Sequence, residues 1–375
     1  MPGRRRVRLA PDRVLAVAVA VLCPLGVLLV WVSTRPRLQA AGGDPQEYLK
    51  RQTVGVVAGL LLMIGVAAIG HRALRAYTVP VYALSCVGLL LVLTPLGTTV
   101  NGAQSWLGLG PLRVQPSEFA KPALVLALAT VLADLPDRET RPRPAQLLLA
   151  LGAAAIPLGL VLLQPDLGTF LILAVTVLGM LALAGTRPLW IALMLLGGVA
   201  VSALAWWLHL LQPHQIRRLT AFADPSADPQ GVGYNATQAL VTVGSGGTFG
   251  RGLFHGDQTG GRFVPEQHTD FIFTAAGEEL GFLGATAVLV LLWIVLWRGL
   301  RIASRAESPF GALAAGGIVC WLAVQTFVNV GMTIGLAPIV GVPLPFLSYG
   351  GSSAISCLLA MGVLQAAHRH DTIRL

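Results

Sequence analysis

The carboxylates around position 270 are the residues best suited to acid–base chemistry. Glu266, His268 and Asp270 occupy every second position, so in an extended chain they lie on one side. Asp270 begins a long apolar run, and in a helix Glu278 would lie about 80° from it, with Glu279 on the opposite side. A carboxylate at the edge of an apolar phase has a raised pKa, so we expect Asp270 to act as a general base. The expected supporting residues are Glu266, His268 and Glu278, although the paired glutamates could instead bind arginine or backbone groups and hold helices together.

Three further polar clusters interrupt the apolar sequence. They are Asn101–Trp106 running into Gln115–Lys121, Gln164–Thr169, and Pro343–Ser353. Each precedes or begins an apolar run on the same predicted side of the membrane, so each is expected to mark a helix N-terminus. Such termini bind phosphate through free N–H groups and the helix dipole, although Ser117 and Asp166 also look like ordinary N-caps. Together with Lys121, one turn inside its helix, the clusters predict an outward-facing pocket for an anionic, amphipathic ligand.

Other motifs do not indicate a function of their own. The glycine-rich segment Gly244–Gly252 lacks both the dinucleotide-binding and the Walker spacing. The chain contains no GxSxG or HExxH motif, and we assign no residues to a metal site. The four cysteines form no CxxC pair and lie inside apolar runs, so they are expected to be packing residues.

The elements that must position these residues are membrane-spanning helices. Apolar residues make up 55% of the 375 positions and charged residues only 11%, compared with about 25% charged residues in a soluble domain. This composition excludes a soluble enzyme with one buried core, a nucleic-acid-binding protein and a disordered scaffold. We predict an all-α integral membrane protein, a single polytopic domain over residues 1–375, with about ten spans of about 20 residues. The expected spans are 12–33, 53–70, 78–96, 118–134, 146–164, 167–185, 189–210, 270–297, 311–335 and 347–367.

The basic residues predict the orientation of these spans. With ten spans both termini lie on one side, and that side collects 16 of the 26 lysines and arginines. Cytoplasmic segments of membrane proteins are enriched in these residues, so we expect cytoplasmic termini and one large external loop, about 211–269. The same enrichment accounts for the net charge of +9 without a polyanionic partner. The basic N-terminal segment and the apolar run that follows it could form a cleaved signal peptide, but this run is long and nine more follow, so a signal-anchor is expected.

The motifs, in order, resemble those of the SEDS family (shape, elongation, division and sporulation), and RodA within that family more than FtsW. The resemblance covers nearly the whole chain. It rests on Gln115–Lys121, Leu163–Thr169, Arg218 through Tyr234, Gly244–Gly247, Pro265–Phe273 with Glu278–Gly281, and Asn329–Met332 through Ser352. The segment Asn101–Gln104 and the short tails are RodA-like and favour a role in elongation.

The resemblance implies a peptidoglycan glycosyltransferase that polymerises lipid II at the outer face of the bacterial plasma membrane. It also implies a partner, a class B penicillin-binding protein that cross-links the new glycan. In the implied reaction, the base deprotonates the GlcNAc 4-hydroxyl of one lipid II, whose oxygen attacks the MurNAc anomeric carbon of the other chain. Undecaprenyl diphosphate leaves, with Mg²⁺ or Mn²⁺ as a candidate helper. A β-linked product from an α-linked donor requires inversion, hence one base and no covalent intermediate.

Residue by residue, the resemblance assigns roles around one external cavity. Asp270 matches the essential aspartate of the family. The expected substrate- and diphosphate-binding residues are Lys121, Arg218, Glu118, Asp166, Arg113, Trp106 and Ser348. Family members often carry arginine before the tryptophan of the first cluster, where this chain has Ser105, so Arg113 or Arg218 would replace that phosphate contact.

Two functions from other classes also fit ten spans. A lipid II flippase would likewise show intramembrane carboxylates and interrupted helices, and a scaffold would only recruit the transpeptidase. The polar clusters gather on the outer face rather than at the membrane midplane, and the chain shows no paired half-repeats. We therefore expect an enzyme acting in cell elongation, with an FtsW-like role in division or sporulation as the alternative within the family.

Overall fold

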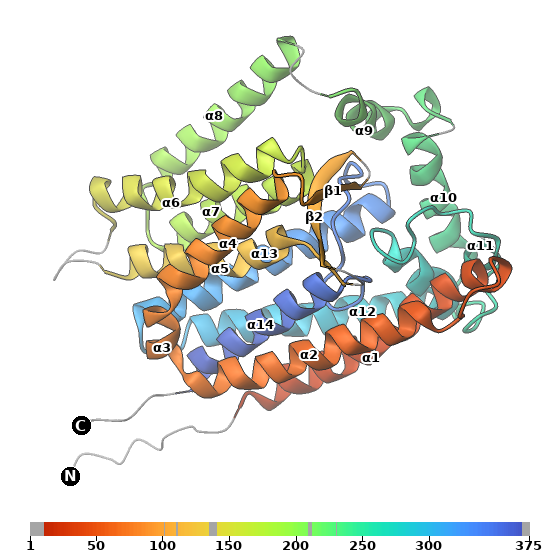
Figure 1. Cartoon of the computed structure of the whole chain (residues 1–375), viewed down its shortest axis with the longest axis horizontal. Coiled ribbons are helices and arrows are strands. Elements are labelled where there is room, and N and C mark those ends of the chain that lie inside the picture. Colours follow the sequence, from red (N-terminus) through yellow and green to blue (C-terminus); the bar gives the residue numbers. More distant parts are fainter. Residues whose placement is uncertain are drawn as a thin grey trace.

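The structure, a computed structural model, places ten apolar helices of 15 or more residues among the described residues (Figure 1). The described residues are 11–100, 102–109, 112–134, 141–208, 212–229 and 231–369. Some positions used in the sequence predictions lie outside these ranges, namely Arg4, Arg5, Arg6, Arg8, Asn101, Arg138 and Arg374.

Each of the ten predicted runs corresponds to one of these helices. They are α1 (Arg13–Ala40), α2 (Glu47–Ile69), α4 (Thr78–Val92), α5 (Pro116–Ala133), α6 (Pro144–Leu163), α7 (Leu167–Leu183), α8 (Pro188–Trp207), α12 (Ile272–Ala303), α13 (Pro309–Thr333) and α14 (Gly351–His368). Eight are long and apolar enough to cross a membrane, and α4 and α7 are shorter apolar helices. A short helix, α3 (His71–Ala76), joins α2 to α4. The predicted all-α membrane fold is confirmed.

Several helix starts follow directly from local sequence. Asp166 caps α7 by accepting a hydrogen bond of 3.0 Å from the backbone N–H of Thr169, as predicted. Ser308 caps α13 in the same way, and proline occupies the first turn of α5, α6, α8 and α13, where its missing N–H costs no hydrogen bond. Ser117 does not cap α5. It lies inside the first turn, and its buried hydroxyl oxygen has no hydrogen-bond partner.

The helix ends predicted to face the cytoplasm do lie together. Asp12, which caps α1, pairs with Arg298 near the end of α12. The backbone N–H of Asp12 also donates to Gln365 Oε1 in α14, at 2.8 Å, and Arg369 donates to the carbonyl oxygen of Ala67 in α2, at 3.1 Å. The start of α1 and the ends of α2, α12 and α14 therefore share one end of the bundle (Figure 1).

The opposite end carries a small antiparallel sheet that the sequence analysis did not predict. Its strands are β1 (Gly97–Val100), β2 (Ala103–Leu109) and β3 (Leu112–Val114), in the order β1-β2-β3. The cluster around Trp106 was expected at a helix N-terminus, but Trp106 lies in β2 opposite Thr98. Gly102, with a φ of 86°, makes the turn between the first two strands possible.

The large loop after α8 is mostly helical. It contains α9 (Pro213–Ala223), the 3₁₀ turn η1 (Pro225–Ala227), α10 (Val232–Ser245) and α11 (Asp257–Gly261). These elements lie on the side of the bundle away from the start of α1 (Figure 1). Helix α8 itself has no buried residue and projects from the bundle (Figure 1).

The glycine-rich segment Gly244–Gly252 serves to pack the loop onto α12. Helix α12 is broken at Gly281, where φ is 68° and ψ is −171°. The freed N–H groups after the break bond to the segment, with Phe282 donating to the carbonyl of Gly247 at 2.8 Å. A methyl group on Gly281 would lie 2.1 Å from the backbone nitrogen of Gly250. The glycines therefore permit a close backbone contact rather than phosphate binding.

Candidate active site

Asp270 lies in a turn immediately before α12. The carbonyl oxygen of Glu266 accepts hydrogen bonds from the N–H groups of Thr269 and Asp270, at 3.2 and 3.1 Å. The expectation that Glu266, His268 and Asp270 alternate along an extended chain is therefore wrong. Pro265 precedes a residue with a positive φ of 50°, and the chain closes into a turn there instead.

Asn329 in α13 fixes the backbone on both sides of the site. Its side-chain N–H groups donate to the carbonyl oxygens of Asp270 and Val342, at 2.8 and 2.7 Å. Asn329 is fully buried, and it joins the start of α12 to the segment 338–350 that leads into α14. Arg218, Asp270 and Gln325 also lie against the 338–350 segment.

Arg218 and Asp270 lie beside Gly341 in the 338–350 segment. A methyl group on Gly341 would lie 3.3 Å from Asp270 Oδ2 and 3.9 Å from both terminal nitrogens of Arg218. Arg218 also donates to the carbonyl oxygen of Val340, at 3.2 Å. No ion pair of Arg218 with another described residue is formed. The predicted base and one predicted diphosphate-binding cation are thus brought together.

The N-terminus of α7 reaches the same segment. A methyl group on Gly168, in the first turn of α7, would lie 2.6 Å from the carbonyl oxygen of Val340. Asp166, the cap of this helix, is close enough to Asp270 for its charge to act on the Asp270 carboxyl. The structure therefore gathers Asp270, Arg218 and Asp166 around residues 340–341.

The surroundings of Asp270 raise its pKa to about 7. Burial is the largest cause, because removal from water disfavours the carboxylate. The negative charge of Glu266 raises the pKa further, the positive charge of Arg218 opposes the rise, and Asp166 adds a smaller increase. A carboxyl group with a pKa near 7 is matched to general-base work at neutral pH.

Lys121 and Glu118 form a buried ion pair in α5. Lys121 Nζ donates to Glu118 Oε1 at 2.7 Å and to Gln325 Oε1 at 3.0 Å, and both charged side chains are 1% exposed. The amide of Gln325 in turn donates to the carbonyl oxygen of Pro343, at 2.7 Å. Lys121 therefore reaches the 338–350 segment through Gln325. Neither Lys121 nor Glu118 faces an open surface on which a diphosphate could lie.

Two other predicted site residues have structural partners. His268 packs between the rings of Tyr48 and Tyr349, at centroid distances of 5.1 and 5.5 Å, and burial lowers its pKa. Ser348 Oγ accepts a hydrogen bond from the N–H of Leu344, at 2.7 Å, inside the 338–350 segment. Both side chains are buried and support the segment from within.

Glu278 does not face Asp270 as an open carboxylate. It accepts hydrogen bonds from the N–H groups of Gln258 and Thr259, at 2.7 and 2.8 Å, and from the Thr259 hydroxyl at 2.6 Å. The helix-phase argument counted from Asp270, which lies in the turn before α12, and it could not reveal α11, which covers Glu278. The sequence left two roles open for Glu278, a part in acid–base chemistry or a bond to backbone groups that holds helices together. The structure shows the bonds to backbone groups.

The residues of the first cluster lie on the small sheet. Arg113 is exposed in β3, and Trp106 is half-buried in β2. The backbone N–H of Gln115, just after β3, donates to Ser352 Oγ in α14, at 3.0 Å. The sheet is therefore attached where the 338–350 segment enters α14.

Sequence reasoning missed Gln325 and Asn329 as site residues. The signal was present, because two amides four residues apart in an apolar span lie on one helix face and require buried partners. Trp321, one turn earlier, donates to Gln325 Oε1 at 2.7 Å and completes this polar face. Among the described residues, no three His, Cys, Asp or Glu side chains gather as metal ligands.

The fold and site define a multi-pass membrane protein with an acidic residue of raised pKa at one end of its helix bundle. Residues 13–373 match the family of FtsW, RodA and SpoVE, described as cell cycle proteins. The chain belongs to this family.

Individual relatives agree over nearly the whole chain. The peptidoglycan glycosyltransferase MrdB of Escherichia coli K12 is 36% identical over 96% of this chain and 94% of its own length. A protein of Nitrosococcus halophilus named probable peptidoglycan glycosyltransferase FtsW is 40% identical over 94% of this chain and 91% of its own. A chain from a structure that describes the coordination of polymerization and crosslinking by a peptidoglycan synthase complex superposes with a TM-score of 0.79. It is 31% identical, and the match covers 96% of this chain and 98% of that one.

Proposed function

We propose that this protein is a peptidoglycan glycosyltransferase that polymerises lipid II at the outer face of the bacterial plasma membrane. The observation that carries the proposal is the Asp270 carboxyl, whose pKa is raised to about 7 beside the cation Arg218. The relatives named as glycosyltransferases cover nearly all of the chain, which favours this function over a flippase or a scaffold. A carboxylate that can accept a proton near neutral pH is what glycosyl transfer to a sugar hydroxyl requires.

In the proposed reaction, Asp270 takes the proton from the 4-hydroxyl of the acceptor GlcNAc. The acceptor oxygen forms a bond to the anomeric carbon of the donor MurNAc, and the bond from that carbon to the diphosphate oxygen breaks. Undecaprenyl diphosphate leaves with the bonding electron pair. Arg218 stabilises this developing charge, because its remaining N–H groups lie on the same side of Gly341 as Asp270.

The other predicted binding residues take different roles in this proposal. Lys121 is a positioning residue, because its ammonium acts on the site through Gln325 and Pro343. Arg113 and Trp106, on the sheet, are proposed to contact the substrate farther from the reacting atoms. The described carboxylates at the site, Asp270, Asp166 and Glu266, would offer few ligands to Mg²⁺ or Mn²⁺, so such an ion would be held mainly by the diphosphate.

A class B penicillin-binding protein is the proposed partner. The support is the matched chain from a peptidoglycan synthase complex that couples polymerization to crosslinking. Cell elongation is the proposed role, on the RodA-like sequence features. Because MrdB and FtsW relatives match with similar identity, depletion of the protein in its host tests this role. Loss of cell width control supports elongation, whereas filamentous cells would assign it to division.

The activity is tested with the purified protein and its partner transpeptidase in detergent micelles with lipid II. Micelles have no two compartments, so a flippase or scaffold yields no polymer there. Asp270→Asn keeps the size of the side chain but removes the base, and loss of a general base typically lowers the rate by about 10²–10⁴-fold. Glycan strands made by the wild type and lost in Asp270→Asn are the expected result. No glycan from the wild type, or equal glycan from the variant, contradicts the proposal.

A further inference from the structure

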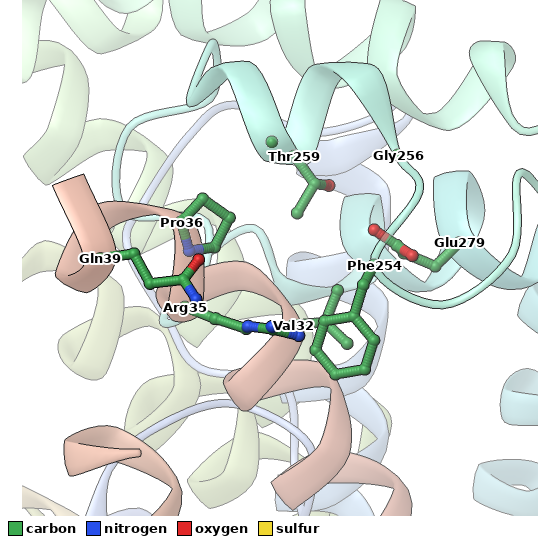
Figure 2. A pocket seen from close by; sticks show the side chains of 9 residues that line it. Val32, Arg35, Pro36, Gln39, Phe254, Gly256, Thr259 and Glu279 are labelled. Atoms are coloured by element: carbon green, nitrogen blue, oxygen red, sulfur yellow. The ribbon is translucent and has the colours of Figure 1, made fainter. Parts of the chain in front are cut away.

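A second polar pocket lies away from Asp270, between α1, α11 and α12. Its volume is about 230 Å³, and it is lined at one side by Arg35 of α1 and at the other by Glu279 of α12. Figure 2 shows both charged groups at the pocket, with Phe254 beside Arg35. At about 30 Å³ for each water-sized group, the pocket holds about eight such groups, the size of a small polar headgroup.

Glu279 presents a buried carboxylate that lacks a cation. Its side chain is 2% exposed, and its Oε2 atom has no hydrogen-bond partner. Neighbouring Glu278 is also buried, and Gly256 lies between the two, so that a methyl group on Gly256 would be 2.7 Å from an oxygen of each. No described lysine or arginine forms an ion pair with either. Two adjacent buried carboxylates without a cation are costly, and a bound cation removes that cost.

The two glutamates differ in how they are satisfied. Glu278 accepts three hydrogen bonds from Gln258 and Thr259. Glu279, which lines the pocket, has the backbone N–H groups of residues 254–256 around it, and its Oε2 has no hydrogen-bond partner. With no third carboxylate, His or Cys in reach among the described residues, the donor set does not suit a metal ion. A primary ammonium needs only hydrogen-bond acceptors of this kind.

Arg35 supplies the opposite charge at the other side of the pocket. Its guanidinium lies 5.0 Å from the ring centroid of Phe254 and 6.0 Å from that of Trp31. It makes no hydrogen bond or ion pair with another described residue. Arg35 lines the pocket and is placed to bind an anionic oxygen, so the pocket as a whole suits a zwitterion.

The position of the pocket along α1 indicates the source of such a zwitterion. Helix α1 has 28 residues, which at 1.5 Å each is about 42 Å, against about 30 Å for the hydrocarbon core. Helix α1 begins at Arg13. Its later residues Arg35 and Gln39 therefore lie beyond the hydrocarbon core, at the depth of lipid headgroups. Two apolar side chains near the break of α12, Phe249 and Phe282, are 82% and 68% exposed and offer apolar surface for acyl chains.

We propose that this pocket binds the headgroup of a phospholipid that carries a primary ammonium and a phosphodiester. The ammonium donates to Glu279, and the phosphate accepts from Arg35. The fit between a carboxylate at one side and a guanidinium at the other selects against headgroups that lack the ammonium N–H donors or the phosphate. The site is separate from the Asp270 site and gives the protein a preference for the lipid around it.

The test titrates full-length protein in detergent with short-chain lipids that differ only in the headgroup. Dihexanoyl phosphatidylethanolamine should bind at least about tenfold more tightly than the phosphatidylcholine or phosphatidylglycerol analogue, because each lacks the ammonium N–H donors. Glu279→Gln should abolish this preference. Arg35→Gln should weaken the binding of the ethanolamine lipid and of the glycerol lipid to the same extent. Lys50→Gln and Glu47→Gln, at the start of α2, are the matched controls and should change nothing, because neither side chain lines the pocket.

Two further measurements separate the remaining outcomes. Gly260 lines the pocket, and a side chain added there meets open space, so Gly260→Leu should block binding while Glu279 stays in place if Glu279→Gln does not fold. Free phosphoethanolamine serves as the soluble probe. Equal binding of all three lipids, or unchanged preference in Glu279→Gln or Gly260→Leu, overturns the site. Free phosphoethanolamine binding as tightly as the lipid overturns the assignment to a lipid headgroup.

Discussion

The side-chain amide of Asn329 donates a hydrogen bond of 2.8 Å to the main-chain oxygen of Asp270. The same amide donates to the main-chain oxygen of Val342 at 2.7 Å, so one residue of α13 holds together the backbone of the base and the segment that carries Gly341. The reacting carboxyl is therefore positioned by a residue that has no charge and does not itself touch the carboxyl group.

Asn329→Leu should lower both stability and activity. The substitution leaves two carbonyl oxygens without their donor, and each buried unpaired group costs about 1–3 kcal/mol. Thermal unfolding in detergent and lipid II polymerisation are the two measurements. Thr333→Val is the control in the same helix, because the Thr333 hydroxyl bonds only to the carbonyl of Val330 within its own helix. Activity equal to the wild type in Asn329→Leu would show that Asp270 needs no such support.

The pKa of Asp270 predicts the pH dependence of polymerisation. A base must be deprotonated to act, and with a pKa of about 7 the active fraction falls about tenfold for each pH unit below that value. The rate should therefore rise with pH up to about 7 and then level off. Initial rates of glycan formation from pH 5.5 to 8.5 check this.

Two neighbours of Asp270 should move this profile in opposite directions. Glu266 raises the pKa of Asp270 and Arg218 lowers it. Glu266→Gln should therefore shift the profile to lower pH, and Arg218→Gln should shift it to higher pH as well as lowering the maximum. Shifts of the same sign in both variants would contradict the electrostatic account.

The buried pair of Lys121 and Glu118 should show its positioning role in a double substitution. Lys121→Met alone leaves Glu118 as a buried unpaired charge, a change that costs about 3–5 kcal/mol. Lys121→Met with Glu118→Gln removes both charges, so unfolding temperature and much of the polymerisation should return. A double variant that folds as the wild type does but makes no glycan would instead assign Lys121 a direct contact with the diphosphate.

The helices and the Asp166 cap could be predicted because their causes are local. Ten long apolar runs defined the helices, and Asp166 after a proline defined the start of α7. The predicted meeting of Asp270, Arg218 and Asp166 also depended on the shared outer ends of those helices. Two early boundaries differed, since α1 continues to Ala40 and α2 starts at Glu47, where polar residues extend helices beyond the apolar core.

The features that escaped prediction depend on partners distant in sequence. Glu278 is satisfied by α11, about twenty residues earlier, and Lys121 is bonded to Gln325 across the bundle. No periodicity in α12 or α5 reports such a contact. The turn at Glu266 and the sheet around Trp106 arise in short polar segments, where alternation of side chains does not distinguish an extended chain from a turn.

The orientation in the membrane remains a prediction and can be checked with reporters. A reporter fused after Gly260 should be outside the cytoplasm, and one fused after Arg305 should be inside. The structure separates these positions, since Arg298 near the end of α12 pairs with Asp12, while Arg262 donates to the carbonyl of Pro36 at the other end of α1. Both reporters on one side would refute the orientation and the outward-facing site with it.

Gly341 offers a test of the spacing between the base and its cation. Its φ is 72°, and a methyl group there would lie 3.3 Å from Asp270 Oδ2, so Gly341→Ala pushes on the carboxyl and also strains the backbone. Gly335 has a φ of 74° in the same connection, but a methyl group there meets only Leu240, at 3.6 Å. Gly335→Ala therefore reproduces the strain, about 1–3 kcal/mol, without the contact.

Both alanine variants should lose similar amounts of stability in a thermal unfolding assay. Only Gly341→Ala should lose polymerisation, by about tenfold or more, since a small displacement of a reacting group can cost that much in rate. The pH profile of its remaining activity should also move, because the gap between Asp270 and Arg218 changes. If the two variants lose activity in proportion to stability alone, then the position of the Asp270 carboxyl beside Gly341 does not limit the reaction.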